Sequence, residues 1–302
     1  MKTRLLLVVL LLLTAVAACG KGDVKPASSG DPTTTTEAAE PATTTTEPAG
    51  EAAVVEVDVT ATDFAYAIDG GGTFPAGEVA ITLTNDGAEE HQVTVVQFRE
   101  GYGFADLEPL AEDPSRLGEV LATFGGPNGV APGDTYTATQ ALEPGEYLFV
   151  CFIPSPEDGE PHALKGMVAP VTVEEAEGPS EPAEADLRLA LSEYEFGLGD
   201  DALLESGRYE VVNRGQQYHE VVLYAPAEGS TAQDVIDFFT SEAPPAGPPP
   251  FVPAGGTAPF DPGGRVVIDI DQGTYVAICF LPDAADGAPH FTKGMVTIIT
   301  FE

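Results

Sequence analysis

The sequence reads GEYLFVC at residues 145–151 and PHALKGM at 161–167, and both segments return 128 residues later, as GTYVAIC (273–279) and PHFTKGM (289–295). A constant offset that persists over most of a chain is the mark of an internal repeat. The sequence therefore predicts two copies of one domain, residues 53–174 and 185–302. The acidic stretch between them, 175–184, is predicted to be a linker.

Within each copy the apolar residues recur with a period of two. Examples are Val55-Val57-Val59 and Val266-Ile268-Ile270, and turn signals such as Asn85-Asp86-Gly87 separate the runs. This alternation is typical of half-buried strands. The pattern predicts seven or eight short strands per copy, arranged as an all-β antiparallel sandwich. One helical interruption is expected at residues 231–240, where Thr231 is a suitable N-cap.

Soft and imidazole ligands are few, and all of them lie in the repeat. Apart from Met1 and Cys19, the chain has four His, two Met and two Cys. Each copy holds one early His, then Cys, His and Met, in the same order and at the same spacing. Two imidazoles, one thiolate and a weak axial thioether form the ligand set of a type 1 copper site. Zinc more often has three or four strong ligands and no use for Met.

At these residues the sequence resembles the plastocyanin and small blue copper (cupredoxin) family. The segments 145–151 and 273–279 are similar to the strand that leads into the family's copper cysteine. The segments 161–167 and 289–295 resemble its connection from the second histidine to the methionine. Asn85 and Asn213 precede the early histidines as an asparagine does in the family.

The resemblance implies two tandem Greek-key β-sandwich domains, each with one type 1-like copper used in one-electron transfer. The implied metal ligands are His91, Cys151, His162 and Met167 in the first copy, and His219, Cys279, His290 and Met295 in the second. One departure from the family is the ten-residue insert between the cysteine and the second histidine of each copy. The insert could return the histidine to the copper as a looped-out hairpin, or leave it on the surface.

Other interpretations of these residues remain open. A strand cysteine and a methionine beside a strand are often only core residues, so a copper-free interaction module is one alternative. A copper storage or delivery protein is another. A disulfide between Cys151 and Cys279 is not expected, because equivalent positions in two separate cores cannot easily meet.

Catalysis is not expected from the sequence. Oxidases and nitrite reductases built from two such domains need additional histidines for a catalytic copper, and the four His are already assigned. No nucleophile pattern accompanies them. The expectation is therefore that the chain is not an enzyme.

The N-terminal region predicts export and lipid attachment. Basic Lys2 and Arg4 precede an apolar run that is too short to span a membrane, so residues 1–18 are predicted to be a signal peptide. Val16-Ala17-Ala18-Cys19 matches a lipobox, which makes Cys19 the expected lipidation site, although an ordinary cleavage site gives the same pattern. Residues 19–52, rich in Thr, Glu and Pro, are expected to be a disordered stalk.

These features place the protein on the outer face of the cytoplasmic membrane or in the periplasm, anchored by an N-terminal lipid. The formal net charge of −37 argues against binding to nucleic acid, whose phosphates would repel the chain. A redox partner, if there is one, is expected to present a basic surface. The protein is expected to be a monomer.

Overall fold

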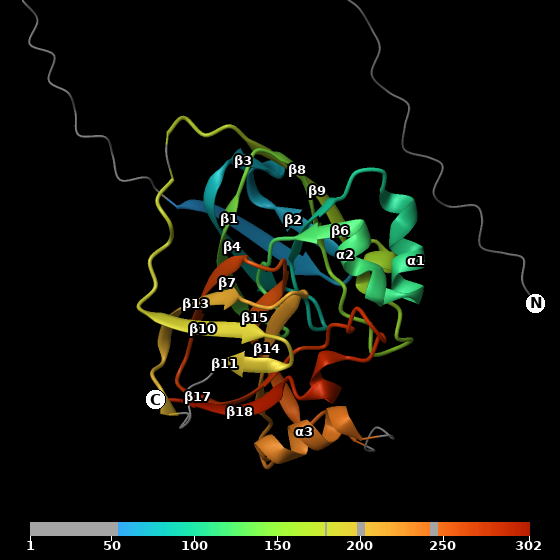
Figure 1. Cartoon of the computed structure of the whole chain (residues 1–302), viewed down its shortest axis with the longest axis vertical. Helices are drawn as coiled ribbons and strands as arrows, with labels where there is room; N and C mark the ends of the chain where they lie inside the picture. Colours follow the sequence, from blue (N-terminus) through green and yellow to red (C-terminus); the bar gives the residue numbers. More distant parts are fainter. Residues whose placement is uncertain (1–53, 179, 198–202, 242–246) are drawn as a thin grey trace, which may run out of the picture. The chain divides into compact units, whose positions relative to one another are not determined.

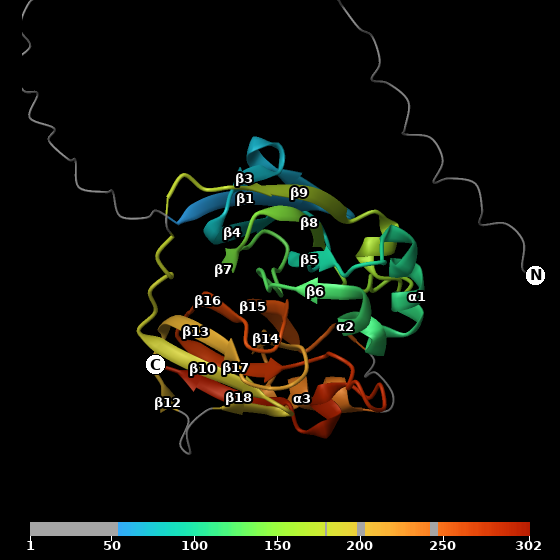
Figure 2. The same cartoon turned by 45° about the horizontal axis from the view of Figure 1, so that its top comes forward.

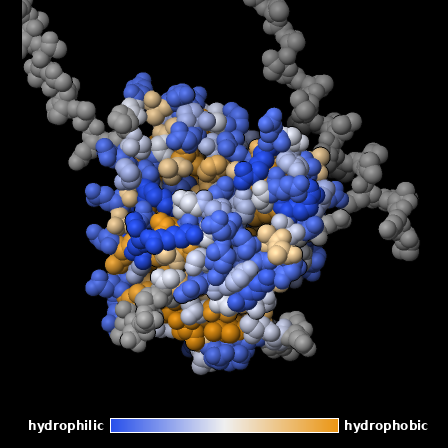
Figure 3. Space-filling view, in the orientation of Figure 1, coloured by the Kyte–Doolittle hydropathy of each residue, from blue (hydrophilic) through white to orange (hydrophobic). Residues whose placement is uncertain are grey.

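The structure is a computed structural model that describes residues 54–302, apart from residues 179, 198–202 and 242–246 (Figure 1). The predicted signal peptide, Cys19 and the stalk lie outside the described residues. Among the described residues, no helix is both long and apolar enough to cross a membrane. The face in Figure 3 is mostly hydrophilic, in keeping with the charge of the chain, with apolar residues gathered near its lower edge.

The first copy is a sandwich of two sheets. Its strands are β1 (Val55–Thr62), β2 (Ala65–Ile68), β3 (Thr73–Pro75), β4 (Gly77–Asn85), β5 (Thr94–Phe98), β6 (Leu121–Thr123), β7 (Thr135–Leu142), β8 (Gly145–Val150) and β9 (Val168–Glu174). One sheet has the order β2-β1-β4-β7 and the other β3-β9-β8-β5-β6. Alternate residues such as Val57, Val59 and Phe149 meet in the core between the sheets.

The second copy repeats this topology strand by strand. Its strands are β10 (Leu187–Ser192), β11 (Glu195–Gly197), β12 (Leu203–Leu204), β13 (Gly207–Asn213), β14 (His219–Pro226), β15 (Phe251–Phe260), β16 (Arg265–Ile270), β17 (Gly273–Ile278) and β18 (Val296–Phe301). The sheets run β11-β10-β13-β16 and β12-β18-β17-β14-β15. The prediction of a two-domain β-sandwich is therefore confirmed, with slightly more strands per copy than expected. The expectation that the sandwich is antiparallel was wrong in part, because β1 pairs parallel with β4 and β10 pairs parallel with β13.

Short helices cover the outer face of the second sheet in each copy. In the first copy they are η2 (Phe104–Asp106), α1 (Leu107–Glu112), η3 (Pro114–Arg116) and α2 (Leu117–Val120); in the second copy α3 (Ala232–Thr240) stands at the corresponding place. Thr231 caps α3 and accepts a hydrogen bond from Asp234 N, which confirms the helix expected there. The helices of the first copy were not anticipated. They explain why β8 is apolar on both faces, since Leu148 and Val150 pack beneath them.

The two copies share one continuous sheet. Strands β7 and β16 pair antiparallel, Thr139 with Val267 and Ala138 with Ile268, and so join two four-stranded sheets into one of eight strands (Figure 2). Thr139 and Val267 are separated by the repeat offset, so equivalent positions of the two copies face each other. Arg265 adds an ion pair to Glu78 across this seam, with Nη2 and Oε1 2.7 Å apart.

Candidate metal centre

The first histidine of each copy is fixed by a turn, which follows β4 in the first copy and β13 in the second. In the first copy the Asn85 amide donates to Glu89 O and Val130 O, both at 2.8 Å, and its oxygen accepts from Gly87 N. Asn213 makes the corresponding bonds to Gln217 O, Phe260 O and Gly215 N. These bonds hold the turn rigid around the histidine that follows.

Glycine is needed in this turn because the histidine ring lies against it. A Cβ at Gly87 would stand 2.7 Å from His91 Nε2, and a Cβ at Gly215 would stand 2.7 Å from His219 Nε2. Either contact is too close for any other residue without a shift of the ring. The repeated glycine is thus part of how the imidazole is positioned.

The cysteine and second histidine are joined by backbone hydrogen bonds around the insert. Cys151 follows β8 directly, and its carbonyl accepts from Ala163 N at 2.8 Å. His162 N donates to Ile153 O, while Ser155 N donates to Glu160 O and closes the loop between them. The second copy makes the equivalent bonds, including Phe291 N to Cys279 O at 3.0 Å. The insert is therefore a closed loop that returns the histidine to the cysteine.

The structure brings two imidazoles and one thiol together in each copy. In the first copy Cys151 Sγ lies 3.4 Å from His162 Nδ1, which in turn lies 3.2 Å from His91 Nδ1. In the second copy Cys279 Sγ lies 3.5 Å from His290 Nδ1. In both clusters, His91–Cys151–His162 and His219–Cys279–His290, the three donor atoms lie within 4.8 Å of one another and every residue is fully buried.

Met167 and Met295 lie beside these clusters in the chain. Each is fully buried and belongs to the same core as the cysteine of its copy. Met167 O accepts from Cys151 N at 3.2 Å, and Met295 O accepts from Cys279 N at 3.1 Å. The backbone thus holds each methionine next to its cysteine. Their role as ligands stays a prediction.

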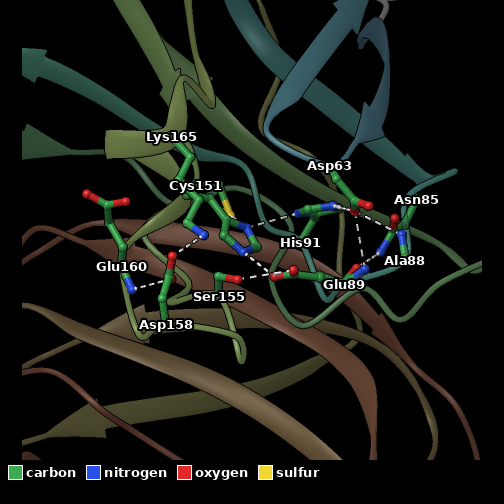
Figure 4. Close-up of polar contacts among 11 residues, drawn as sticks. Asp63, Asn85, Ala88, Glu89, His91, Cys151, Ser155, Asp158, Glu160 and Lys165 are labelled. Atoms are coloured by element: carbon green, nitrogen blue, oxygen red, sulfur yellow. Dashed lines mark hydrogen bonds and ion pairs between the residues drawn. The ribbon is translucent and has the colours of Figure 1, made fainter.

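The donor atoms fit a metal ion. Ligands at bonds of roughly 2 Å around one metal stand about 3.3–3.5 Å from each other, close to the 3.4 Å from Cys151 Sγ to His162 Nδ1 and the 3.5 Å from Cys279 Sγ to His290 Nδ1. In the first copy each Nε2 faces a carboxylate, His91 that of Asp63 at 3.3 Å and His162 that of Glu89 at 2.9 Å (Figure 4). With the protons on Nε2, the two Nδ1 lone pairs face each other, an arrangement that a cation bound to both nitrogens would stabilise.

In the second copy, too, a bound metal would stabilise buried imidazole nitrogens. Both nitrogens of His219 and Nε2 of His290 are buried without a hydrogen-bond partner among the residues that the structure describes. A buried polar atom without a partner carries a desolvation cost. A metal bound at the Nδ1 atoms would offset part of this cost.

Burial disfavours the charged forms of the cysteine and of most of the histidines in the two clusters. Burial, together with the charge of His290, lowers the pKa of His219 to about 4. Burial also lowers the pKa of His91 and of His290. Burial raises the pKa of the Cys151 thiol to about 12 and raises that of Cys279 as well. Metal binding would therefore displace a proton from each thiol and none from His91, His219 or His290.

Two aromatic residues that sequence reasoning missed cover the second histidines. Phe64 meets the His162 ring edge-on at 5.2 Å between centroids, and Tyr194 meets His290 at 5.4 Å. Among the described residues these two are the non-glycine residues with positive φ, 67° and 62°. Such a backbone is uncommon for bulky residues and marks a position held by its surroundings. The turns just after β1 and β10 carry no sequence signal that would have identified them.

Cys151 and Cys279 are both free and buried, in agreement with the expectation that they form no disulfide.

No family model and no curated protein matches the sequence. Among solved structures, dithionite-reduced auracyanin from Roseiflexus castenholzii is 22% identical, covers 40% of this chain and 98% of its own length, and gives a TM-score of 0.28. A blue copper oxidase from Nitrosomonas europaea is 16% identical and covers 82% of this chain and 86% of its own, with a TM-score of 0.24.

A copper nitrite reductase from Nitrosomonas europaea is also similar, at 15% identity over 83% of this chain and 94% of its own, with a TM-score of 0.23. Enzymes therefore occur among the similar structures, and the expectation that this chain is not an enzyme is corrected. A count of histidines was not a sufficient ground for excluding catalysis. What the strand order supports is the fold alone: the described part of the chain consists of two β-sandwich domains that share one topology.

Proposed function

We propose that each copy binds one copper ion in a type 1-like site and that the protein serves one-electron transfer. The ligands would be His91, Cys151 and His162 with Met167 as the weak axial ligand, and His219, Cys279 and His290 with Met295. The observation that carries the proposal is the pair of buried clusters, each with two imidazole nitrogens and one thiol sulfur within 4.8 Å. Thiolate and imidazole together suit both Cu(I) and Cu(II).

The protein's own contribution would be rigidity and exclusion of water. The bonds of Asn85 and Asn213 fix the first histidine, and the loop closed at Ser155 and Glu160 fixes the second. A bound copper would supply a one-electron couple. Because its ligands are fully buried and held from several strands, they would move little when the charge of the site changes.

The remaining parts of the proposal concern location and partners. A lipid on Cys19 would anchor the protein to the outer face of the cytoplasmic membrane or within the periplasm. The net charge of −37 favours a redox partner with a basic surface and disfavours nucleic acid. Loss of membrane association on Cys19→Ala would support the anchor, whereas mass spectrometry that finds an unmodified N-terminus elsewhere would refute it.

Copper titration of the metal-free protein tests the central proposal. We expect two copper ions per chain and an intense visible thiolate-to-Cu(II) charge-transfer band. Cys151→Ala and Cys279→Ala should each remove one copper and its share of the band, and the double variant should remove both. The two single variants are matched controls, because each keeps the other site intact. Absence of colour and of stoichiometric copper would favour a copper-free interaction module.

Electrochemistry separates electron transfer from copper storage or delivery. A carrier should be oxidised and reduced repeatedly without loss of metal. A storage or delivery protein should instead release Cu(I) to a chelator of moderate affinity within one cycle.

A further inference from the structure

A cavity of about 480 Å³ lies between the two copies. Its wall is mostly apolar, with aromatic rings that include Phe152, Phe251 and Phe280. Helices α1, α2 and α3 contribute to the wall, so the segments inserted at the same place in each copy enclose it. The volume is within the range of small-molecule sites.

Two carboxylates stand in this apolar wall, Glu90 from the first copy and Glu220 from the second. Glu220 accepts from Phe280 N at 3.0 Å and from the Asn128 amide at 3.3 Å, which fixes its orientation. Glu90 accepts from the Tyr224 hydroxyl at 3.3 Å. The carboxylates are therefore held in place by neutral donors.

No cation faces these two carboxyl groups. Among the described residues neither Glu90 nor Glu220 forms an ion pair, and the wall includes no Lys, Arg or His. Buried carboxylates without a counter-charge are costly. Aromatic faces and a carboxylate are the groups that recognise an organic ammonium ion, the faces through cation–π attraction.

We propose that this cavity binds a small organic cation, an ammonium group on an aromatic or aliphatic body. The ammonium group would lie between Glu90 and Glu220, and the apolar body against the rings. The strongly acidic chain would also attract such a ligand from solution. The site needs no metal and goes beyond the copper function, although Phe152 and Phe280 directly follow Cys151 and Cys279 and so place the cavity beside both clusters.

Calorimetric titration of the full, metal-free chain with matched probes tests the proposal. Phenethylammonium should bind at least roughly tenfold more tightly than 2-phenylethanol, which has the same ring and a neutral head group, because only the ammonium pairs with the carboxylates. Glu90→Gln and Glu220→Gln should each weaken phenethylammonium binding by about tenfold or more. The exposed Glu157→Gln in the first insert is the control and should leave binding unchanged.

Equal affinity of the unaltered chain for the two probes would overturn the proposal, and so would a lack of phenethylammonium binding. Binding that persists unchanged in both glutamine variants would overturn it as well. Thermal melts of each variant establish that it is folded, and the comparison of probes on the unaltered chain stands even if a variant does not fold.

Discussion

The two clusters have the same donors but different surroundings. In the first copy both imidazoles face carboxylates through Nε2, His91 that of Asp63 and His162 that of Glu89. In the second copy no described residue forms a hydrogen bond with Nε2 of His219 or of His290. Duplication has preserved the residues that can touch a metal and has let the hydrogen bonds behind them diverge.

The divergence can be traced to single residues. At the repeat equivalent of Glu89 stands Gln217, and at that of Ser155 stands Asp283. In the second copy the Asp283 carboxylate accepts from Tyr194 and Gln217 and pairs with Lys293, rather than bonding an imidazole. A carboxylate behind a histidine makes the imidazole a better donor to a positive metal. The two sites should therefore differ in affinity and potential although their donors are equivalent.

The largest effect is expected from Glu89→Gln. Loss of a carboxylate partner behind a metal-ligating histidine typically weakens metal binding by roughly 10–100-fold. We expect Cu(II) affinity of the first site to fall by that factor, measured by competition with a chelator in the Cys279→Ala background. The exposed Glu160→Gln should have no effect there. An equal loss in both variants would mean that only general surface charge matters.

A smaller effect is expected between the potentials of the two unaltered sites. The first site, with carboxylates behind both histidines, should favour Cu(II) and have the lower potential, by about 60 mV if the preference is tenfold. Voltammetry of Cys279→Ala and Cys151→Ala reports each site alone. Identical potentials, or a higher potential for the first site, would contradict this prediction.

No difference between the copies is expected in the protons that copper displaces. The pKa of both thiols is raised, that of Cys151 to about 12, whereas burial lowers the pKa of His219 to about 4 and also lowers the pKa of His91 and of His290. Each site should thus release about one thiol proton, and its affinity should rise about tenfold per pH unit between pH 7 and 9. Calorimetry in buffers of different ionisation enthalpy measures this number. A value near zero would mean that the thiol is not a ligand.

The sequence was sufficient to predict the fold, because its main determinants are local and repeated. Alternation such as Val55-Val57-Val59 indicated strands, and Thr231 indicated the start of α3. The constant offset of the His, Cys, His and Met set was enough by itself to indicate two sites. The structure answers the open question of the insert, since His162 lies within 3.4 Å of Cys151.

The rest depended on contacts between distant residues. Asp63 and Phe64 reach the first site from the turn after β1. Glu90 and Glu220 line the same cavity only because the two copies pack against each other. No spacing rule relates such positions. The pairing of β7 with β16 was also beyond the sequence, because an edge strand and a paired strand have the same alternation.

That pairing bears on how the molecule arose. Strands β7 and β16 are equivalent edges, and Thr139 meets its own counterpart Val267. A contact that joins identical surface patches is the contact of a two-fold symmetric homodimer. A single-domain ancestor with this edge would have paired with itself, burying the exposed strand that otherwise invites aggregation. A linker between two such halves would make the contact intramolecular, so that each half could change its charges independently of the other.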